Sequence, residues 1–192
     1  YIRLGFSILP CAPKSKGPYV KLLPRVNGKP SWSVYQGTRV DAATAIDWTT
    51  YDPGTNIGII CGAISGGLHV GDIDDVEFCN WLLSDASALL LTKTWTVRTG
   101  GGKLHVYLIS RTPHTTMILN DSRGHKLMEL RADGAGDAGP SYVMAPPSTH
   151  PSGQHYSTWF GSPEHIVPVN DAEQLFRLLI AHYEAARDHA AV

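Results

Sequence analysis

Apolar residues fall in short runs separated by turn-forming residues, a pattern typical of a chain built around short strands. Pairs such as Pro53-Gly54 and Gly66-Gly67 mark the expected turns, and Pro146-Pro147 opens a turn-rich, aromatic stretch that continues to Phe160. The runs that predict strands are Leu4–Leu9, Ile57–Cys61, Leu68–Ile73, Thr94–Arg98, Leu104–Ile109, Lys126–Arg131 and Tyr142–Ala145.

Two segments in the first half of the chain space their apolar residues as one side of a helix does. The first covers 41–50 and carries Ala42 and Ile46 on one side. The second begins at Asp75 and continues to about Leu91. Its expected apolar stripe consists of Val76, Cys79, Leu83, Ala86 and Leu90.

A third helix is predicted for the C-terminal segment, 171–190. Asn170 is its expected N-cap, and Glu173 follows at the spacing of a capping box. Its apolar stripe consists of Leu175, Leu178, Leu179, His182 and Ala186. Together these elements predict an α+β fold with a mixed or mainly antiparallel sheet flanked by helices.

The composition narrows the class of protein. The chain has 192 residues, of which 43% are hydrophobic and 17% charged, so we exclude a disordered chain and a coiled coil. The apolar runs are too short to cross a bilayer, so no membrane is expected. Three widely spaced cysteines, Cys11, Cys61 and Cys79, predict neither a disulfide framework nor a structural zinc site.

The N-terminus gives two expectations. No leader precedes the first apolar run, and the chain begins at Tyr1 rather than Met. We therefore expect a domain excised from a longer protein. We also expect a cytoplasmic location.

The formal net charge of −1 conceals an uneven distribution of charge. Residues 1–40 contain basic side chains and no acid, and the same is true of 86–120. If the fold brings these two stretches together, they form a cationic face that suits nucleic acid. The alternative is that the basic residues lie on solvated loops.

The strongest local signal is the acidic pair Asp72 and Asp74, at the end of an apolar run. Residues two apart in a strand project to the same face, and two facing carboxylates repel one another unless a cation or a proton lies between them. Hard divalent cations prefer such oxygen ligands. The alternative is an acidic turn in which Asp74 and Asp75 cap the next helix.

A second signal is the segment Thr99–Tyr107, in which three glycines precede Lys103 and His105. Successive glycines allow the backbone to approach an anion closely and to present several N–H groups to it. Lys103 adds a point charge for a phosphate, and His105 projects to the same face of its strand. The alternative is a flexible hairpin that precedes an ordinary half-buried histidine.

A third signal is Glu129, which lies among apolar residues and is followed two positions later by Arg131. A carboxylate in such a place is unfavourable unless it is paired or bound to a metal. An edge-strand ion pair of Glu129 with Arg131 explains the pattern equally well.

Taken in order, these residues resemble the N-terminal prim-pol domain of bifunctional DNA primase/polymerases, in the archaeo-eukaryotic primase superfamily. The segments that carry the resemblance are Gly5–Pro10, Lys16–Pro18, Ile46–Trp48, Asn56–Gly62, Asp72–Asp74, Thr99–Tyr107, Glu129 and Tyr142–Ser148. Two positions depart from the family pattern: Lys103 stands where a small residue is usual, and Glu129 where aspartate is common. Asp133 is therefore an alternative third acid, and the zinc-binding insert of some relatives is not evident.

The resemblance implies a single catalytic domain with an RRM-like core and an N-terminal α/β unit. Its lobes are expected at about 1–65 and 66–170, before the helix at 171–190. It implies that Asp72, Asp74 and Glu129 hold two Mg²⁺ or Mn²⁺ ions, with no zinc. Residues implied to bind the nucleoside triphosphate are Lys16, Gly101, Gly102, Lys103, His105 and Arg131.

The implied partners are a single-stranded DNA template and nucleoside triphosphates. We expect Lys14, Lys21 and Arg25 to follow the template backbone, an interaction that is independent of sequence and sensitive to salt. Trp32 and Trp159 are candidates for stacking on bases, as is Trp48. Relatives occur in plasmids, phages and defence systems and are often fused to a helicase.

Two other functions remain open at this stage. Acids and a histidine also serve a metal-dependent nuclease or phosphohydrolase. A module that binds single-stranded DNA without catalysis is the other alternative. The sequence leaves open the choice between ribonucleotides and deoxyribonucleotides, and between de novo priming and primer extension.

Overall fold

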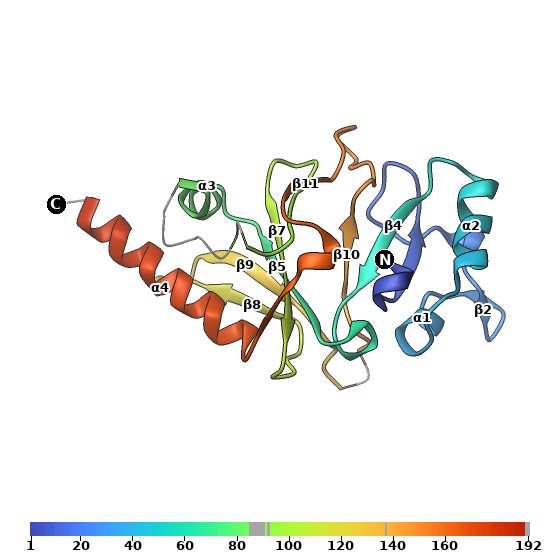
Figure 1. Cartoon of the computed structure of the whole chain (residues 1–192), viewed down its shortest axis with the longest axis horizontal. Helices are drawn as coiled ribbons and strands as arrows, with labels where there is room; N and C mark the ends of the chain where they lie inside the picture. The colour runs from blue at the N-terminus through green and yellow to red at the C-terminus, as the bar shows by residue number, and fades with distance from the viewer. Residues whose placement is uncertain (85–90, 92, 137, 191–192) are drawn as a thin grey trace.

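The computed structural model describes residues 1–84, 91, 93–136 and 138–190, and it contains two main β-sheets (Figure 1). The first sheet has the order β1-β4-β10 and is antiparallel throughout. Its strands are β1 (Ile8–Cys11), β4 (Asn56–Ile60) and β10 (Tyr142–Ala145). Helix α1 (Val34–Gly37), helix α2 (Ala42–Tyr51) and a small hairpin of β2 (Arg25–Val26) and β3 (Lys29–Pro30) lie at this end of the molecule.

The second sheet has the order β11-β6-β7-β5-β9-β8, and β12 adds to it by pairing parallel with β7. Its other pairings are antiparallel. Its strands are β5 (Leu68–Ile73), β6 (Thr96–Arg98), β7 (Leu104–Ser110), β8 (Met117–Asn120), β9 (Lys126–Arg131), β11 (Ser157–Phe160) and β12 (Val167–Val169).

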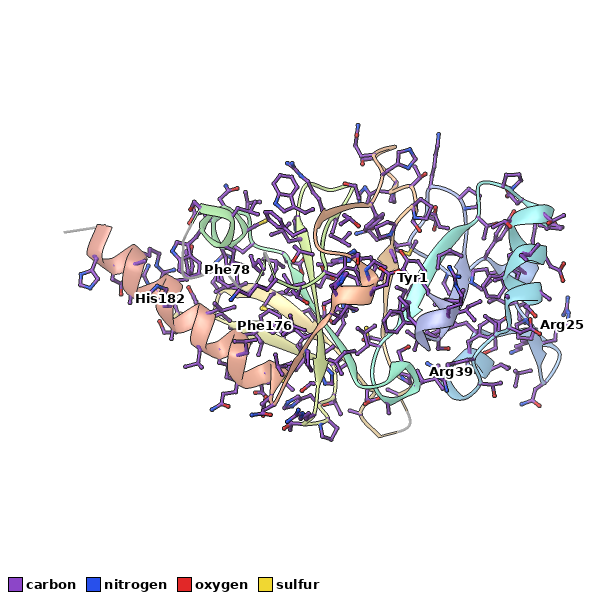
Figure 2. All side chains as sticks on the ribbon, viewed as in Figure 1. Tyr1, Arg25, Arg39, Phe78, Phe176 and His182 are labelled. Atoms are coloured by element: carbon purple, nitrogen blue, oxygen red, sulfur yellow. The ribbon has the colours of Figure 1, made fainter. Side chains whose placement is uncertain are left out.

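Helices α3 (Val76–Ser84) and α4 (Ala172–Ala190) cover one face of the second sheet. Phe78 and Phe176 point from these helices toward the sheet and are fully buried (Figure 2). Gly71 of β5 allows this close approach, because a Cβ atom there would lie 2.5 Å from Cζ of Phe176. The opposite face of the same strands packs through Val70 and Tyr107 against the apolar core of the first sheet.

The predicted α+β class with a mixed, mainly antiparallel sheet and flanking helices is confirmed. The predicted bounds of β5, β9 and β10 match the structure. β1 begins at Ile8 and not at Leu4, because Ile2–Leu4 forms a 3-10 turn that ends at Gly5 with φ +81°. Strands β2, β3, β8, β11 and β12 were not predicted. The predicted division into lobes stays a prediction.

The predicted starts of the helices agree with the structure better than their predicted buried sides do. Asp41 caps α2 by accepting from Thr44 N at 2.8 Å, and Asp75 caps α3 by accepting from Phe78 N at 2.8 Å. For α4 the cap is Asp171, which accepts from Gln174 N at 2.9 Å, and not Asn170.

The predicted apolar stripes are partly wrong. Ile46 of α2 is 63% exposed, whereas Trp48 of the same helix is buried. In α3 the buried residues are Phe78, Cys79 and Leu82, whereas Val76 is exposed, and the predicted continuation through 85–90 lies outside the described residues. In α4 the buried residues include Phe176, Leu179, Ile180 and Tyr183, whereas Leu178 and His182 are exposed.

Two absences are relevant to the sequence expectations. Within the ranges given above, no helix combines the length and the apolar character needed to cross a membrane. Cys11, Cys61 and Cys79 are buried, and each is a free thiol.

Candidate active site

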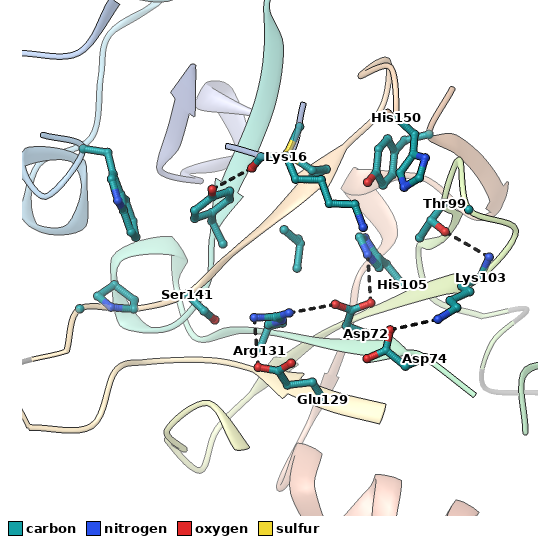
Figure 3. A pocket seen from close by; sticks show the side chains of 18 of the residues that line it. Lys16, Asp72, Asp74, Thr99, Lys103, His105, Glu129, Arg131, Ser141 and His150 are labelled. Carbon is teal, nitrogen blue, oxygen red and sulfur yellow. Dashed lines mark hydrogen bonds and ion pairs between the residues drawn. The ribbon is translucent and has the colours of Figure 1, made fainter. Parts of the chain in front are cut away.

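A pocket of about 710 Å³ opens on the face of the second sheet that the helices leave uncovered (Figure 3). The predicted site residues that line it are Lys16, Asp72, Asp74, Gly101, Lys103, His105, Glu129 and Arg131. The fold therefore brings together residues from the N-terminal basic segment and from three neighbouring strands.

A row of three polar side chains crosses the centre of the sheet. Asp72 of β5 is the register partner of His105 on β7 and of Glu129 on β9. Cross-strand partners share a face, so all three side chains lie on the pocket side. The strand order β7-β5-β9 thus explains why three separate sequence signals form one cluster.

His105 is buried within this row, with 5% of its surface exposed. Its Nε2 atom lies 3.4 Å from Oδ1 of Asp72. Its Nδ1 atom is buried and has no hydrogen-bond partner among the described residues. A buried polar atom without a partner is uncommon, which sets this ring apart from an ordinary core histidine.

Each of the three carboxylates pairs with a basic side chain. Arg131 bridges two of them, since its Nη2 lies 3.2 Å from Oδ2 of Asp72 and its Nη1 lies 3.1 Å from Oε1 of Glu129. Nζ of Lys126 lies 2.7 Å from Oδ2 of Asp74, and Nζ of Lys103 lies 3.4 Å from Oδ1 of the same residue. The acidic floor of the pocket is therefore neutralised by the protein itself.

These contacts set the protonation of the site. Burial alone would raise the pKa of the Asp72 carboxyl, but the hydrogen bond and charge of His105, together with Arg131, hold that pKa well below its usual value. The hydrogen bond to Asp74 raises the pKa of the Lys126 ammonium. Asp72 is consequently ionised and Lys126 charged at neutral pH.

The donor chemistry of the three acids fits a hard divalent cation. Asp72 and Glu129 offer oxygen ligands on one face of the sheet, and Asp74, just after the end of β5, offers its own to the same pocket. With their present rotamers, however, no group of three or more His, Cys, Asp and Glu side chains in the described part of the chain is close enough to hold a metal ion. The carboxylates are turned instead toward Lys103, Lys126 and Arg131.

The glycine segment forms a tight turn beside the acids. Gly102 has φ +82°, a left-handed conformation, and its N–H donates to Thr99 O at 2.9 Å. The Lys103 N–H donates to Oγ1 of Thr99 at 3.1 Å. Gly101 lines the pocket, whereas the Gly102 N–H is engaged within the turn.

His150 and Tyr156 line the pocket but were not predicted from the sequence. A Cβ atom on Gly100 would lie 2.2 Å from Cβ of His150, so the bare glycine backbone permits this contact. The Tyr156 ring lies 5.9 Å from the rings of both His105 and His150. Desolvation and the charge of Lys16 lower the pKa of His150. The only sequence signal for this contact was the aromatic stretch that follows Pro147.

The N-terminal part of the chain supplies the far wall of the pocket. Trp32 and Gln36 line it, and the Trp32 ring packs edge-on against Tyr142 at 5.1 Å. The Tyr142 hydroxyl donates to the carbonyl oxygen of Lys16 at 2.8 Å. This bond ties the loop that carries Lys16 to the start of β10.

Other candidates lie elsewhere. Lys14, Lys21 and Arg25 are exposed and do not line the pocket. Trp48 is buried, and Trp159 is 40% exposed beneath the Arg98 guanidinium, outside the pocket.

Asp133, the alternative third acid, does not line the pocket. Its carboxylate accepts from the Ala63 N–H at 3.0 Å and lies against Gly62. Glu129, by contrast, lies in the row with Asp72.

Comparison with known proteins adds one finding. A family model described as "Bifunctional DNA primase/polymerase, N-terminal" matches residues 1–172. The matched range contains the pocket and both main sheets, and it ends at the first residue of α4. No curated protein matches the chain.

Proposed function

Because the chain belongs to the bifunctional DNA primase/polymerase N-terminal family, we propose that its pocket catalyses template-directed nucleotidyl transfer. The substrates are nucleoside or deoxynucleoside triphosphates and a 3′-hydroxyl on a single-stranded DNA template. The observation that carries the proposal is the row of His105, Asp72 and Glu129 across three strands, next to a glycine turn with a basic residue.

Asp72, Asp74 and Glu129 are the residues that would hold two Mg²⁺ or Mn²⁺ ions. Their oxygen donors fit such ions, and the depressed pKa of Asp72 keeps that carboxylate ionised. Bound divalent cations lower the pKa of an attacking hydroxyl and neutralise the leaving pyrophosphate.

The triphosphate lies, in this proposal, between the glycine turn and the N-terminal loop. Lys103 and Lys16, which both line the pocket, supply positive charge, and the Gly101 backbone permits close approach of a phosphate oxygen. We assign His105, which lines the pocket, to the triphosphate as well, and we add His150 because its ring lies against the glycines.

Arg131 orients the two acids of the row. Its guanidinium bridges Asp72 and Glu129, which holds both carboxylates on the pocket floor. In this role Arg131 positions the metal ligands. We also propose that its guanidinium contacts a phosphate of the nucleotide.

The template strand is proposed to enter along the N-terminal basic segment. Lys14, Lys21 and Arg25 are exposed there, where basic side chains contact backbone phosphates independently of base sequence. Trp32, on the pocket wall, is the aromatic side chain best placed to stack on a base. A helicase that opens duplex DNA, fused or separate, is the expected partner.

Primer extension on labelled single-stranded DNA, with Mn²⁺ and with or without triphosphates, tests this proposal. We expect extension, or dinucleotide formation without primer, only when triphosphates are present. Shortening of labelled DNA without triphosphates would instead support a nuclease. Salt-sensitive DNA binding without triphosphate binding would support a non-catalytic module.

The variant that tests the metal ligands is the double substitution Asp72→Ala with Asp74→Ala. It is expected to keep its circular dichroism spectrum and to lose extension. Extension that survives in this double variant would refute the assignment of the metal ligands.

A further inference from the structure

Lys126 lines the pocket although no sequence pattern predicted it there. It is the first residue of β9, and its ammonium lies 2.7 Å from Oδ2 of Asp74 and 3.5 Å from Oε2 of Glu129. Glu129 lies on β9, whereas Asp74 lies just after the end of β5. One ammonium group therefore bridges two of the three acids that would bind metal.

The other basic side chains of the site are placed differently. Arg131 bridges Asp72 and Glu129, and Lys103 reaches only Asp74, at 3.4 Å. Among the described residues, Lys126 is the one basic side chain that contacts both Asp74 and Glu129. Its contact with Asp74 is also the shorter of the two lysine contacts.

The carboxylates of Asp74 and Glu129 need a positive charge between them. Clustered carboxylates repel one another unless a cation neutralises them. A divalent cation held by Asp74 and Glu129 would draw on the same two carboxylates that Lys126 contacts, and its charge would repel the ammonium. Lys126 and such a cation would therefore compete for these two carboxylates.

We propose that Lys126 is an internal counter-ion of the metal site: its ammonium holds Asp74 and Glu129 in the metal-free protein and is displaced when a divalent cation binds. This inference rests on the proposed function, since it takes the three acids as metal ligands. The side chain of Lys126 is 39% exposed, and its flexible stem allows the ammonium to swing into solvent. Lys126 is thus a residue that sets metal affinity.

The proposal predicts an unusual sign for a mutation at a binding site. Loss of a residue that only supports the structure, or that helps to bind the ion, weakens metal binding. Loss of a competing charge strengthens it. Lys126→Met keeps the apolar stem and removes the charge, so we expect its Mn²⁺ affinity to rise on the order of threefold to tenfold.

The experiment is a Mn²⁺ titration followed by electron paramagnetic resonance, without nucleotide, on the whole chain. Lys126→Arg keeps the charge and is expected to retain wild-type affinity. Lys29→Met removes an exposed charge on β3, outside the pocket, and is expected to change nothing. Lys126→Gln repeats the measurement with a different side chain in case Lys126→Met does not fold.

Tighter Mn²⁺ binding by Lys126→Met, together with wild-type affinity in Lys126→Arg, supports the counter-ion role. If the wild type binds Mn²⁺ and the charge-free variants bind it equally well or more weakly, the inference is overturned while the proposed function stands. If neither the wild type nor the charge-free variants bind Mn²⁺, the metal assignment and this inference both fail.

Discussion

The two faces of β5, β7 and β9 differ in chemistry although they belong to the same residue runs. On one face, Ile73, Val106 and Met128 are fully buried beneath α3 and α4. On the other, Asp72, His105 and Glu129 line a pocket. Because strand side chains alternate, each strand contributes both to the core and to the site. The apolar face fixes the strand register, and the register aligns the polar row.

Substitutions on the polar face are expected to affect activity, and those on the apolar face stability. The largest effect is expected on the polar face. Asp72→Asn is expected to reduce nucleotidyl transfer by roughly 10³-fold, because a metal ligand contributes several kcal/mol to catalysis. Its melting temperature at neutral pH should fall by only a few degrees, through loss of the ion pairs of Asp72 with His105 and Arg131. Single-turnover primer extension and thermal unfolding measure the two quantities. A large drop in melting temperature together with the lost activity would break the separation between the faces.

The apolar face should behave in the opposite way. Phe176→Ala is expected to lower the free energy of unfolding by about 3–5 kcal/mol, since the side chain is fully buried against Gly71 and Met128. Urea denaturation measures this change. Leu178→Ala is the control on the same helix: Leu178 is 63% exposed, and a change within about 0.5 kcal/mol is expected.

Phe176 also lies beyond residue 172, where the family match ends. A stability of Phe176→Ala equal to that of Leu178→Ala would show that α4 does not seal this face. The loss expected for Phe176→Ala instead makes α4 an integral part of the folded unit.

A smaller effect is expected at the rim of the polar face. His150→Ala should weaken triphosphate binding by about tenfold, the worth of a hydrogen bond to a charged group. Isothermal titration with a non-hydrolysable triphosphate and Mn²⁺ measures this. His165→Ala alters an exposed histidine outside the pocket and serves as control. Equal affinities for the two variants would remove His150 from the site.

The smallest effect concerns pH. The pKa of Asp72 is lower in the folded protein than in the unfolded chain, so this carboxylate stabilises the fold above its unfolded pKa of about 3.9. The stabilisation is lost as the pH falls below that value toward the folded pKa. The difference in unfolding free energy between wild type and Asp72→Asn should therefore be constant near neutral pH and shrink below about pH 4. A difference that does not change between pH 7 and pH 3 would contradict this.

The elements that were predicted correctly from the sequence are those defined by local patterns. Strands β5 and β9 were located correctly because apolar runs flanked by turns define them. Asp41 and Asp75 were recognised as helix starts because capping is a local interaction. The polar row followed from local signals at Asp72 and His105, which the strand order then joined.

The features that were not predicted depend on contacts between segments far apart in the sequence. β12 contains Pro168, which argues against a strand, yet it pairs parallel with β7 at the sheet edge. Ile46 and Val76 lie outside the core because tertiary packing decides which side of a helix is covered. His150 reaches the glycine turn across about fifty residues of chain, a separation at which no periodicity gives a signal. Lys126 was missed because its role depends on Asp74, which lies far away in the sequence, just after β5.

The most direct test of the central claim is a crystal structure of the chain with Mn²⁺ and a non-hydrolysable nucleoside triphosphate. We expect anomalous scattering peaks at the carboxylates of Asp72, Asp74 and Glu129, with the triphosphate between the glycine turn and Lys16. Metal bound without these three carboxylates, or a triphosphate seated away from His105, would contradict the account.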